Sequence, residues 1–92
     1  MTARILVIDD DAVACEFLQE ALLRAGYKVD AHTSAEEALK LDLSGYDLMI
    51  SDIRMPVIDG LQFLRHVQDK WPDIPVILVT SSGSLETTMD AL

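Results

Sequence analysis

The stretch RILVI at residues 4–8 runs directly into Asp9 and Asp10, and the stretch DLMIS at residues 47–51 runs directly into Asp52. A short aliphatic run bounded by polar residues is typical of a buried strand in a parallel sheet. Ligands of open α/β sheets bind just beyond the carboxyl ends of such strands. If the two strands are neighbours, the three carboxylates crowd together, and a divalent cation is the usual remedy for their repulsion. The two stretches therefore predict a metal-assisted carboxylate site on an α/β fold.

Strands and helices alternate along the rest of the chain. The predicted strands occupy residues 4–8, 27–32, 47–51 and 76–80, and the predicted helices occupy residues 12–25, 34–43, 60–71 and 84–92. Right-handed crossovers between successive strands make such a sheet parallel, with helices on both faces. This order predicts a doubly wound α/β domain.

The helix boundaries carry recognisable signals. Asp11 is a suitable N-cap for the first helix, and Gly26 is a typical residue at its end. Residues 34–37, Ser-Ala-Glu-Glu, match a capping box, which predicts the start of the second helix. In the first helix, apolar residues recur at helical spacing in two rows, Val13, Phe17 and Ala21 and then Leu18, Leu22 and Ala25.

The composition is that of one small, acidic domain. The chain has 92 residues, 50% of them hydrophobic, which is enough for a core and argues against disorder. It carries 16 acidic against 7 basic residues, and its net charge of -9 is spread along the chain. A segment without a basic stripe is poorly suited to nucleic acid, so we expect no direct nucleic-acid binding by this domain.

Cys15 is the only cysteine, so neither a disulfide framework nor a cysteine-based zinc site can form within the chain. The N-terminal residues enter a strand at once and lack the layout of a signal peptide. No apolar run is long enough to span a bilayer. We therefore expect a cytoplasmic protein that does not act at a membrane.

The C-terminal end of the chain is unusual. The predicted last helix has no glycine, proline or basic final turn to end it. The fourth strand is almost wholly apolar and would lie at the border of the sheet, where a long apolar edge is an aggregation hazard. We therefore expect a fragment of a longer protein, and we expect this fragment to self-associate as a dimer.

The acidic residues suit magnesium chemistry. Mg2+ prefers oxygen ligands, keeps several waters and is often held by one or two carboxylates together with phosphate oxygens. A carboxylate beside such a metal can attack phosphorus and form an aspartyl phosphate. Thr80, at the end of the fourth strand, could donate a hydrogen bond to a phosphoryl oxygen at the same edge of the sheet. The structural alternative is that residues 9–11 only cap a helix and Asp52 only ends a strand.

Three stretches closely resemble the receiver domain of two-component response regulators: RILVIDDD at residues 4–11, DLMISDIRMPVIDG at residues 47–60 and PVILVT at residues 75–80. The resemblance covers essentially the whole chain, with the motifs in the same order. It implies a flavodoxin-like, doubly wound parallel sheet with strand order 2-1-3-4. It also implies that residues 1–92 form one receiver domain that is incomplete at its C-terminus, because the family's fifth strand, with its lysine, and fifth helix have no counterpart.

The resemblance also implies roles for individual residues. Asp52 corresponds to the phospho-acceptor. Asp10 and Asp52 correspond to metal ligands through their side chains, and Asp9 supports the metal through water. The backbone carbonyl of Arg54 would complete the protein ligands of a Mg2+ ion. Thr80 corresponds to the switch hydroxyl that moves to meet the phosphoryl group.

Residues 83–92 are similar to the same segment in receivers of bacterial enhancer-binding transcriptional activators, in which an ATPase domain and a DNA-binding domain follow. The implied function is that of a phospho-acceptor signalling domain and not of an enzyme. A sensor histidine kinase would supply the phosphoryl group, and phosphorylation would switch an output surface that regulates transcription.

Two alternatives stay open. A truncated receiver could act only by association, because its fourth strand and flanking helices would lack partners. A small metal-dependent phosphohydrolase of the haloacid dehalogenase type would also use a nucleophilic aspartate at a strand end. Such enzymes place an Asp-x-Asp-x-Thr pattern on the first strand, which residues 9–13, DDDAV, do not match. Multiple turnover of a phosphate ester would indicate the enzyme, and a single stable label would indicate the receiver.

Overall fold

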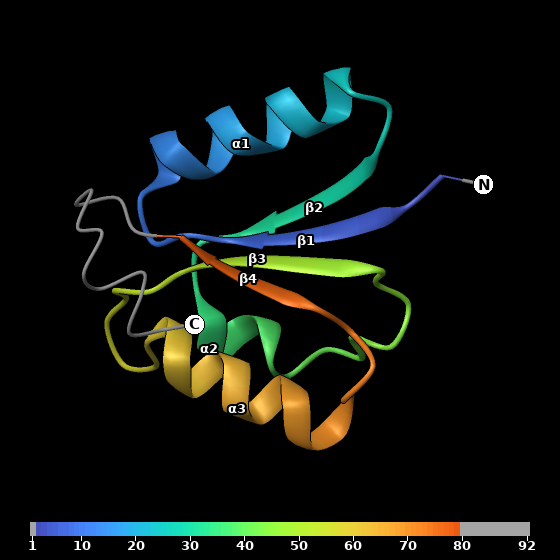
Figure 1. Ribbon diagram of the computed structural model, residues 1–92. Coiled ribbons are helices and arrows are strands. Elements are labelled where there is room, and N and C mark those ends of the chain that lie inside the picture. Colours follow the sequence, from blue (N-terminus) through green and yellow to red (C-terminus); the bar gives the residue numbers. More distant parts are fainter. Residues whose placement is uncertain (1, 80–92) are drawn as a thin grey trace.

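Four parallel strands form the sheet of the computed structural model, which describes residues 2–79 (Figure 1). Across the sheet the order is β2 (Lys28–His32), β1 (Arg4–Ile8), β3 (Leu48–Asp52) and β4 (Val76–Val79). Helix α1 (Ala12–Arg24) covers one face, and helices α2 (Ala35–Ala38) and α3 (Gly60–Lys70) cover the other. The predicted doubly wound fold and its strand order are confirmed.

Strand β1 lies inside the sheet and is buried on both faces. Leu6 and Ile8 pack into the core on the side of α2 and α3, where Phe63 is fully buried. Ile5 and Val7 pack on the other side, against α1. A strand that is covered on both faces has no wet side, which explains why its sequence is an unbroken apolar run.

Helix α1 begins at the predicted residue 12 and ends at residue 24, one residue earlier than predicted. The Asp11 carboxylate accepts hydrogen bonds from the amides of Val13 and Ala14, at 3.0 and 3.4 Å. The helix ends just before Gly26, whose φ of 99° lies in the left-handed region that glycine adopts without strain.

The two apolar rows of α1 differ in burial. Leu18 and Leu22 pack against the core cluster beside Cys15, whereas Val13 and Phe17 are 74% and 75% exposed. Both rows are apolar and follow helical spacing, so the sequence alone does not favour either of them. In the structure α1 packs mainly over β1 and β2. Within the described residues, only one row therefore meets the sheet.

Helix α2 is shorter than predicted. The Ser34 hydroxyl oxygen accepts a hydrogen bond from the Glu37 amide at 3.2 Å, so the predicted N-cap is present. The helix nevertheless ends at Ala38 and does not reach residue 43. Tighter i→i+3 backbone bonds close its last turn, and the chain then buries Leu43 completely in the core. Burial of Leu43 overrides the local preference for a longer helix.

The other boundaries differ from the prediction by about one residue. β2 begins at residue 28 instead of 27, β3 covers 48–52 instead of 47–51, and α3 ends at residue 70 instead of 71. Residue 80 of the predicted fourth strand and the predicted helix at 84–92 lie outside the described residues. Between residues 2 and 79, no helix has the length and apolar character needed to cross a membrane.

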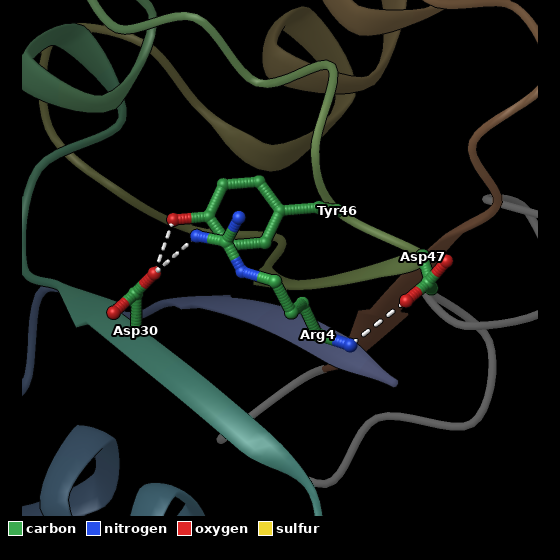
Figure 2. A network of polar contacts seen from close by, with 4 residues as sticks. All are labelled: Arg4, Asp30, Tyr46 and Asp47. Atoms are coloured by element: carbon green, nitrogen blue, oxygen red, sulfur yellow. Dashed lines mark hydrogen bonds and ion pairs between the residues drawn. The ribbon is translucent and has the colours of Figure 1, made fainter. Parts of the chain in front are cut away.

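A polar network joins β1, β2 and the loop before β3, on the side of the sheet away from Asp9, Asp10 and Asp52 (Figure 2). The Arg4 guanidinium lies 4.9 Å from the centre of the Tyr46 ring, and one of its nitrogens lies 3.3 Å from Asp30 Oδ2. The Tyr46 hydroxyl donates to the same oxygen at 2.6 Å, and the Arg4 amide donates to Asp47 Oδ2 at 2.9 Å. Burial and the bond to Asp30 raise the pKa of Tyr46 to about 12, and the same bond lowers the pKa of Asp30.

Candidate functional site

Three carboxylates meet at the carboxyl ends of two neighbouring strands. Asp9 and Asp10 follow β1, and Asp52 is the last residue of β3. The two strands pair in parallel with Ile8 level with Ser51, so Asp9 and Asp52 come next on each strand. Each acid offers a carboxylate oxygen, and these oxygens lie within 4.8 Å of one another. The strand register thus brings the three side chains together, as the sequence predicts.

The three acids differ in their contact with water. Asp52 is 2% exposed and Asp9 is 8% exposed, whereas Asp10 is exposed. Burial raises the pKa of Asp9, and the charges of Asp52, Asp10 and Asp11 raise it further. The hydrogen bond from the Asp11 amide to Asp9 Oδ1, at 2.9 Å, acts in the opposite direction. Like charges in a partly dry site favour a bound cation.

The chemistry of the donor set fits Mg2+. All three donors are hard carboxylate oxygens, two from buried residues and one from a residue open to solvent. A cation held there would keep room for water molecules, which Mg2+ retains in most protein sites. In the described part of the chain no histidine or cysteine joins this group, so it matches a zinc site poorly.

The start of α3 fixes the backbone at Asp52. The Gly60 amide donates to the carbonyl oxygen of Ile53 at 2.7 Å. A Cβ atom at position 60 would lie 2.3 Å from the Asp52 carbonyl oxygen, so only glycine allows this approach. The Asp59 carboxylate accepts from the Gln62 amide at 2.9 Å, and the Gln62 side chain accepts from the Asp59 amide at 3.0 Å. This capping box fixes the first turn of α3, and the bond from the Gly60 amide to Ile53 joins that turn to the residue after β3.

An open hollow of about 490 Å³ lies beside the acids, and its lining consists of Asp10, Ile53, Arg54, Met55, Pro56 and Asp59. The lining combines carboxylates, a cationic residue and apolar groups from the loop between β3 and α3. A hollow of this size next to converging carboxylates has room for a phosphoryl group.

Arg54 and Thr80 are the two predicted site residues outside the carboxylate cluster. Arg54 is exposed, and its amide lies 3.4 Å from Asp52 Oδ1, to which it donates. The use of its carbonyl oxygen by a metal stays a prediction, as do the ligand and acceptor roles of the three acids. Thr80 lies outside the described residues, and its hydroxyl role also stays a prediction. The residue before it, Val79, is level with Asp52 in the sheet.

Asp59 has a role that no sequence argument assigned. It lines the hollow and caps α3 at the same time. The pattern Asp-x-x-Gln at residues 59–62 is a capping-box signal that could have identified it.

This chain is similar in sequence to proteins of a known family. The family model of the response regulator receiver domain matches residues 5–92. Response regulator protein FleR of Pseudomonas aeruginosa is 37% identical over 93 residues, which cover 100% of this chain and 20% of FleR. Transcriptional regulatory protein ZraR of Escherichia coli is 38% identical over 89 residues, which cover 96% of this chain and 20% of ZraR. The chain therefore spans about one fifth of the length of these curated relatives.

A solved structure extends the similarity to three dimensions. Response regulator protein TrrA of Thermotoga maritima, in complex with Mg2+-BeF, is 41% identical to this chain and superimposes with a TM-score of 0.82. The match covers 98% of this chain and 81% of the TrrA chain. Residues 2–79 therefore have the same fold as that chain.

Proposed function

Because the chain belongs to the response regulator receiver domain family, we propose that it is the phospho-acceptor domain of a two-component phosphorelay. In this proposal Asp52 accepts a phosphoryl group from the phosphohistidine of a sensor histidine kinase. The observation that carries the proposal is the convergence of the Asp9, Asp10 and Asp52 carboxylates within 4.8 Å, beside an open hollow. The proposed domain comprises residues 1–92.

The transfer is a displacement at phosphorus. A carboxylate oxygen of Asp52 forms the new O–P bond while the N–P bond to the donor histidine breaks and the imidazole leaves. The Arg54 amide, 3.4 Å from Asp52 Oδ1, orients the carboxylate. The Ser51 hydroxyl donates to the Asp52 carbonyl oxygen at 3.0 Å and steadies the backbone at the end of β3. Because Asp52 is only 2% exposed, attack takes place away from bulk water.

The proposed cofactor is Mg2+. Asp10 and Asp52 would hold it through their carboxylates, Asp9 through a water molecule and Arg54 through its carbonyl oxygen. When bound, Mg2+ supplies positive charge that screens the carboxylate from the phosphoryl oxygens. The TrrA structure contains Mg2+-BeF, and the similarity of that chain supports the same cofactor here.

Phosphorylation is proposed to act as a switch. A phosphoryl group adds negative charge and strong acceptor oxygens, to which the Thr80 hydroxyl would donate. Formation of this hydrogen bond would bias an output surface of the domain. The relative ZraR is a transcriptional regulatory protein, which supports regulation of transcription as the output. We further propose a cytoplasmic location and no direct nucleic-acid contact by this acidic domain, whose net charge is -9.

Labelling with acetyl phosphate and Mg2+ tests the proposal. We expect the wild-type chain to gain the mass of one phosphoryl group, and Asp52→Asn to gain none. Asp59→Asn is the matched control, because Asp59 lines the same hollow and asparagine caps a helix as well as aspartate does. Labelling of Asp52→Asn at the wild-type rate would refute the assignment of the acceptor.

The enzymatic alternative predicts a different time course. A phosphohydrolase would release many equivalents of phosphate from a small ester, whereas the proposed receiver takes up one phosphoryl group per chain. We propose that the chain is not an enzyme. Release of many equivalents of phosphate from p-nitrophenyl phosphate, lost in Asp52→Asn, would count against this.

Self-association of the chain is a further part of the proposal. Val13 and Phe17 on α1 and Ile77 and Val79 on β4 are large apolar residues, each at least 37% exposed. Exposed apolar groups on an edge strand and on the helix over the same sheet favour pairing with a second copy. Sedimentation equilibrium should then find a dimer whose affinity falls in Phe17→Ser. A monomer at all concentrations would exclude this form of association.

A further inference from the structure

Val57 lies in the loop between β3 and α3, and its backbone is strained. Among residues 2–79 it is the only residue other than glycine with a positive φ, 68°. A β-branched residue is a steric outlier in this left-handed region, which glycine and asparagine tolerate far better. The side chain is 78% exposed, so packing within the described residues does little to offset the strain.

A tight turn imposes this conformation. The Ile58 amide donates to the carbonyl oxygen of Pro56 at 2.8 Å, which closes a γ-turn around Val57. A γ-turn with a positive φ at its central residue is the rarer and more strained form. Strain of this kind persists where the surrounding structure enforces it, and it is concentrated at functional sites.

The loop is closed at its base, directly beside Asp52. The hydrogen bond of 2.7 Å from the Gly60 amide to the Ile53 carbonyl oxygen joins the two ends of the loop. Because the ends are joined, a backbone change at Val57 has to be absorbed within the loop itself. Arg54 belongs to this loop, and its amide lies 3.4 Å from Asp52 Oδ1. The strained turn and the Arg54 amide therefore belong to one closed loop, which contacts the acid cluster at Asp52.

We propose that Val57 is a positioning residue that lowers the affinity of the acid cluster for a divalent cation. In the structure the turn is closed and the three carboxylates converge, so the closed turn belongs to the cation-ready arrangement. Strain at Val57 raises the free energy of the closed turn relative to open loop conformations. When only a fraction of the molecules has the conformation that a ligand needs, the apparent affinity is the intrinsic affinity multiplied by that fraction. The inference rests on the proposed cation role of Asp9, Asp10 and Asp52.

Calorimetric titration of the 92-residue chain with Mg2+ tests this inference. Val57→Asn introduces a polar residue that tolerates a positive φ. Val57→Thr is the matched control, because it is also polar but keeps the β-branched shape and hence the strain. We expect Val57→Asn to bind Mg2+ about five-fold more tightly than Val57→Thr and the wild type. Without Mg2+, Val57→Asn should also have a higher Tm than Val57→Thr, because the relief of strain does not depend on the cation.

The outcomes separate this inference from the proposed function. If the wild type binds Mg2+ and the two variants bind it equally, the role of Val57 is overturned and the proposed function stands. If the wild type does not bind Mg2+, or if Asp10→Asn binds it as tightly as the wild type, the proposed cation site fails and the inference fails with it.

Discussion

Gly60→Ala should destabilise the fold and slow phosphorylation together, because position 60 touches the backbone of Asp52. A Cβ atom there would lie 2.3 Å from the Asp52 carbonyl oxygen and 2.7 Å from the Ile53 Cα atom. Both are main-chain atoms of a strand end and the residue after it, so neither can rotate away as a side chain would. The start of α3 has to move off β3 instead.

The size of the effect follows from three contributions. Forcing an extra methyl group into a packed contact costs about 1–3 kcal/mol. Loss of the hydrogen bond of 2.7 Å from the Gly60 amide to the Ile53 carbonyl oxygen costs about 1 kcal/mol more. Alanine restricts the unfolded chain more than glycine does, which offsets about 0.5–1 kcal/mol. The free energy of unfolding should therefore fall by about 2 kcal/mol, which for a domain of this size lowers Tm by roughly 10 °C.

Urea and thermal unfolding followed by circular dichroism measure this loss, and labelling by acetyl phosphate measures its effect on the site. Gly45→Ala is the matched control. Its Cβ atom would lie 2.9 Å from a guanidinium nitrogen of Arg4, which is the far end of a flexible, half-exposed side chain. We expect that substitution to cost less than about 1 kcal/mol and to leave labelling unchanged. Equal losses of stability in the two variants would refute the argument from the close approach of Gly60 to Asp52.

Three further predictions concern other parts of the molecule. The pKa of Asp30 is lowered in the folded state, so its contribution to stability is present above the ordinary pKa of 3.8 and is lost as the pH falls through the lower folded value. Tyr46→Phe removes the main cause of this shift. Urea unfolding should therefore show that this variant loses less stability on acidification than the wild type. Mg2+ at about 100 times its Kd should raise the free energy of unfolding by roughly 2.7 kcal/mol, and calorimetric scans should show little such effect in Asp10→Asn. At concentrations at which the chain is monomeric, Phe63→Ala should lower the free energy of unfolding by about 3–5 kcal/mol, because its side chain is fully buried. Under the same conditions Phe17→Ala should lower it by less than about 0.5 kcal/mol, because its side chain is 75% exposed, and equal losses would contradict the burial pattern.

Much of the fold could be predicted from local patterns. The run ILVI in β1 is apolar without a break because both faces of that strand are covered, and this requirement is visible in the sequence. The N-caps Asp11 and Ser34 act on amides two or three residues away, so their chemistry is local as well. The convergence of Asp9, Asp10 and Asp52 could also be predicted, because parallel strands place their carboxyl ends at one edge of the sheet.

Other features depend on contacts between segments that are far apart in the chain. Helical spacing could not tell which row of α1 would face the sheet, because Phe17 and Leu18 are both apolar and only the placement of α1 over β1 and β2 separates them. The end of α2 was predicted wrongly because the burial of Leu43 depends on core residues from other elements.

The site shows the same division. Its acids are visible in the sequence as residues that follow two apolar strands. The surroundings of these acids are not visible in the sequence. The contact of Gly60 with Asp52 and the strained turn at Val57 arise only when α3 packs back against the end of β3. A sequence pattern records the chemistry of each residue and of its near neighbours along the chain. The distances across the sheet and between the loop and the strand end come from packing, which no local pattern contains.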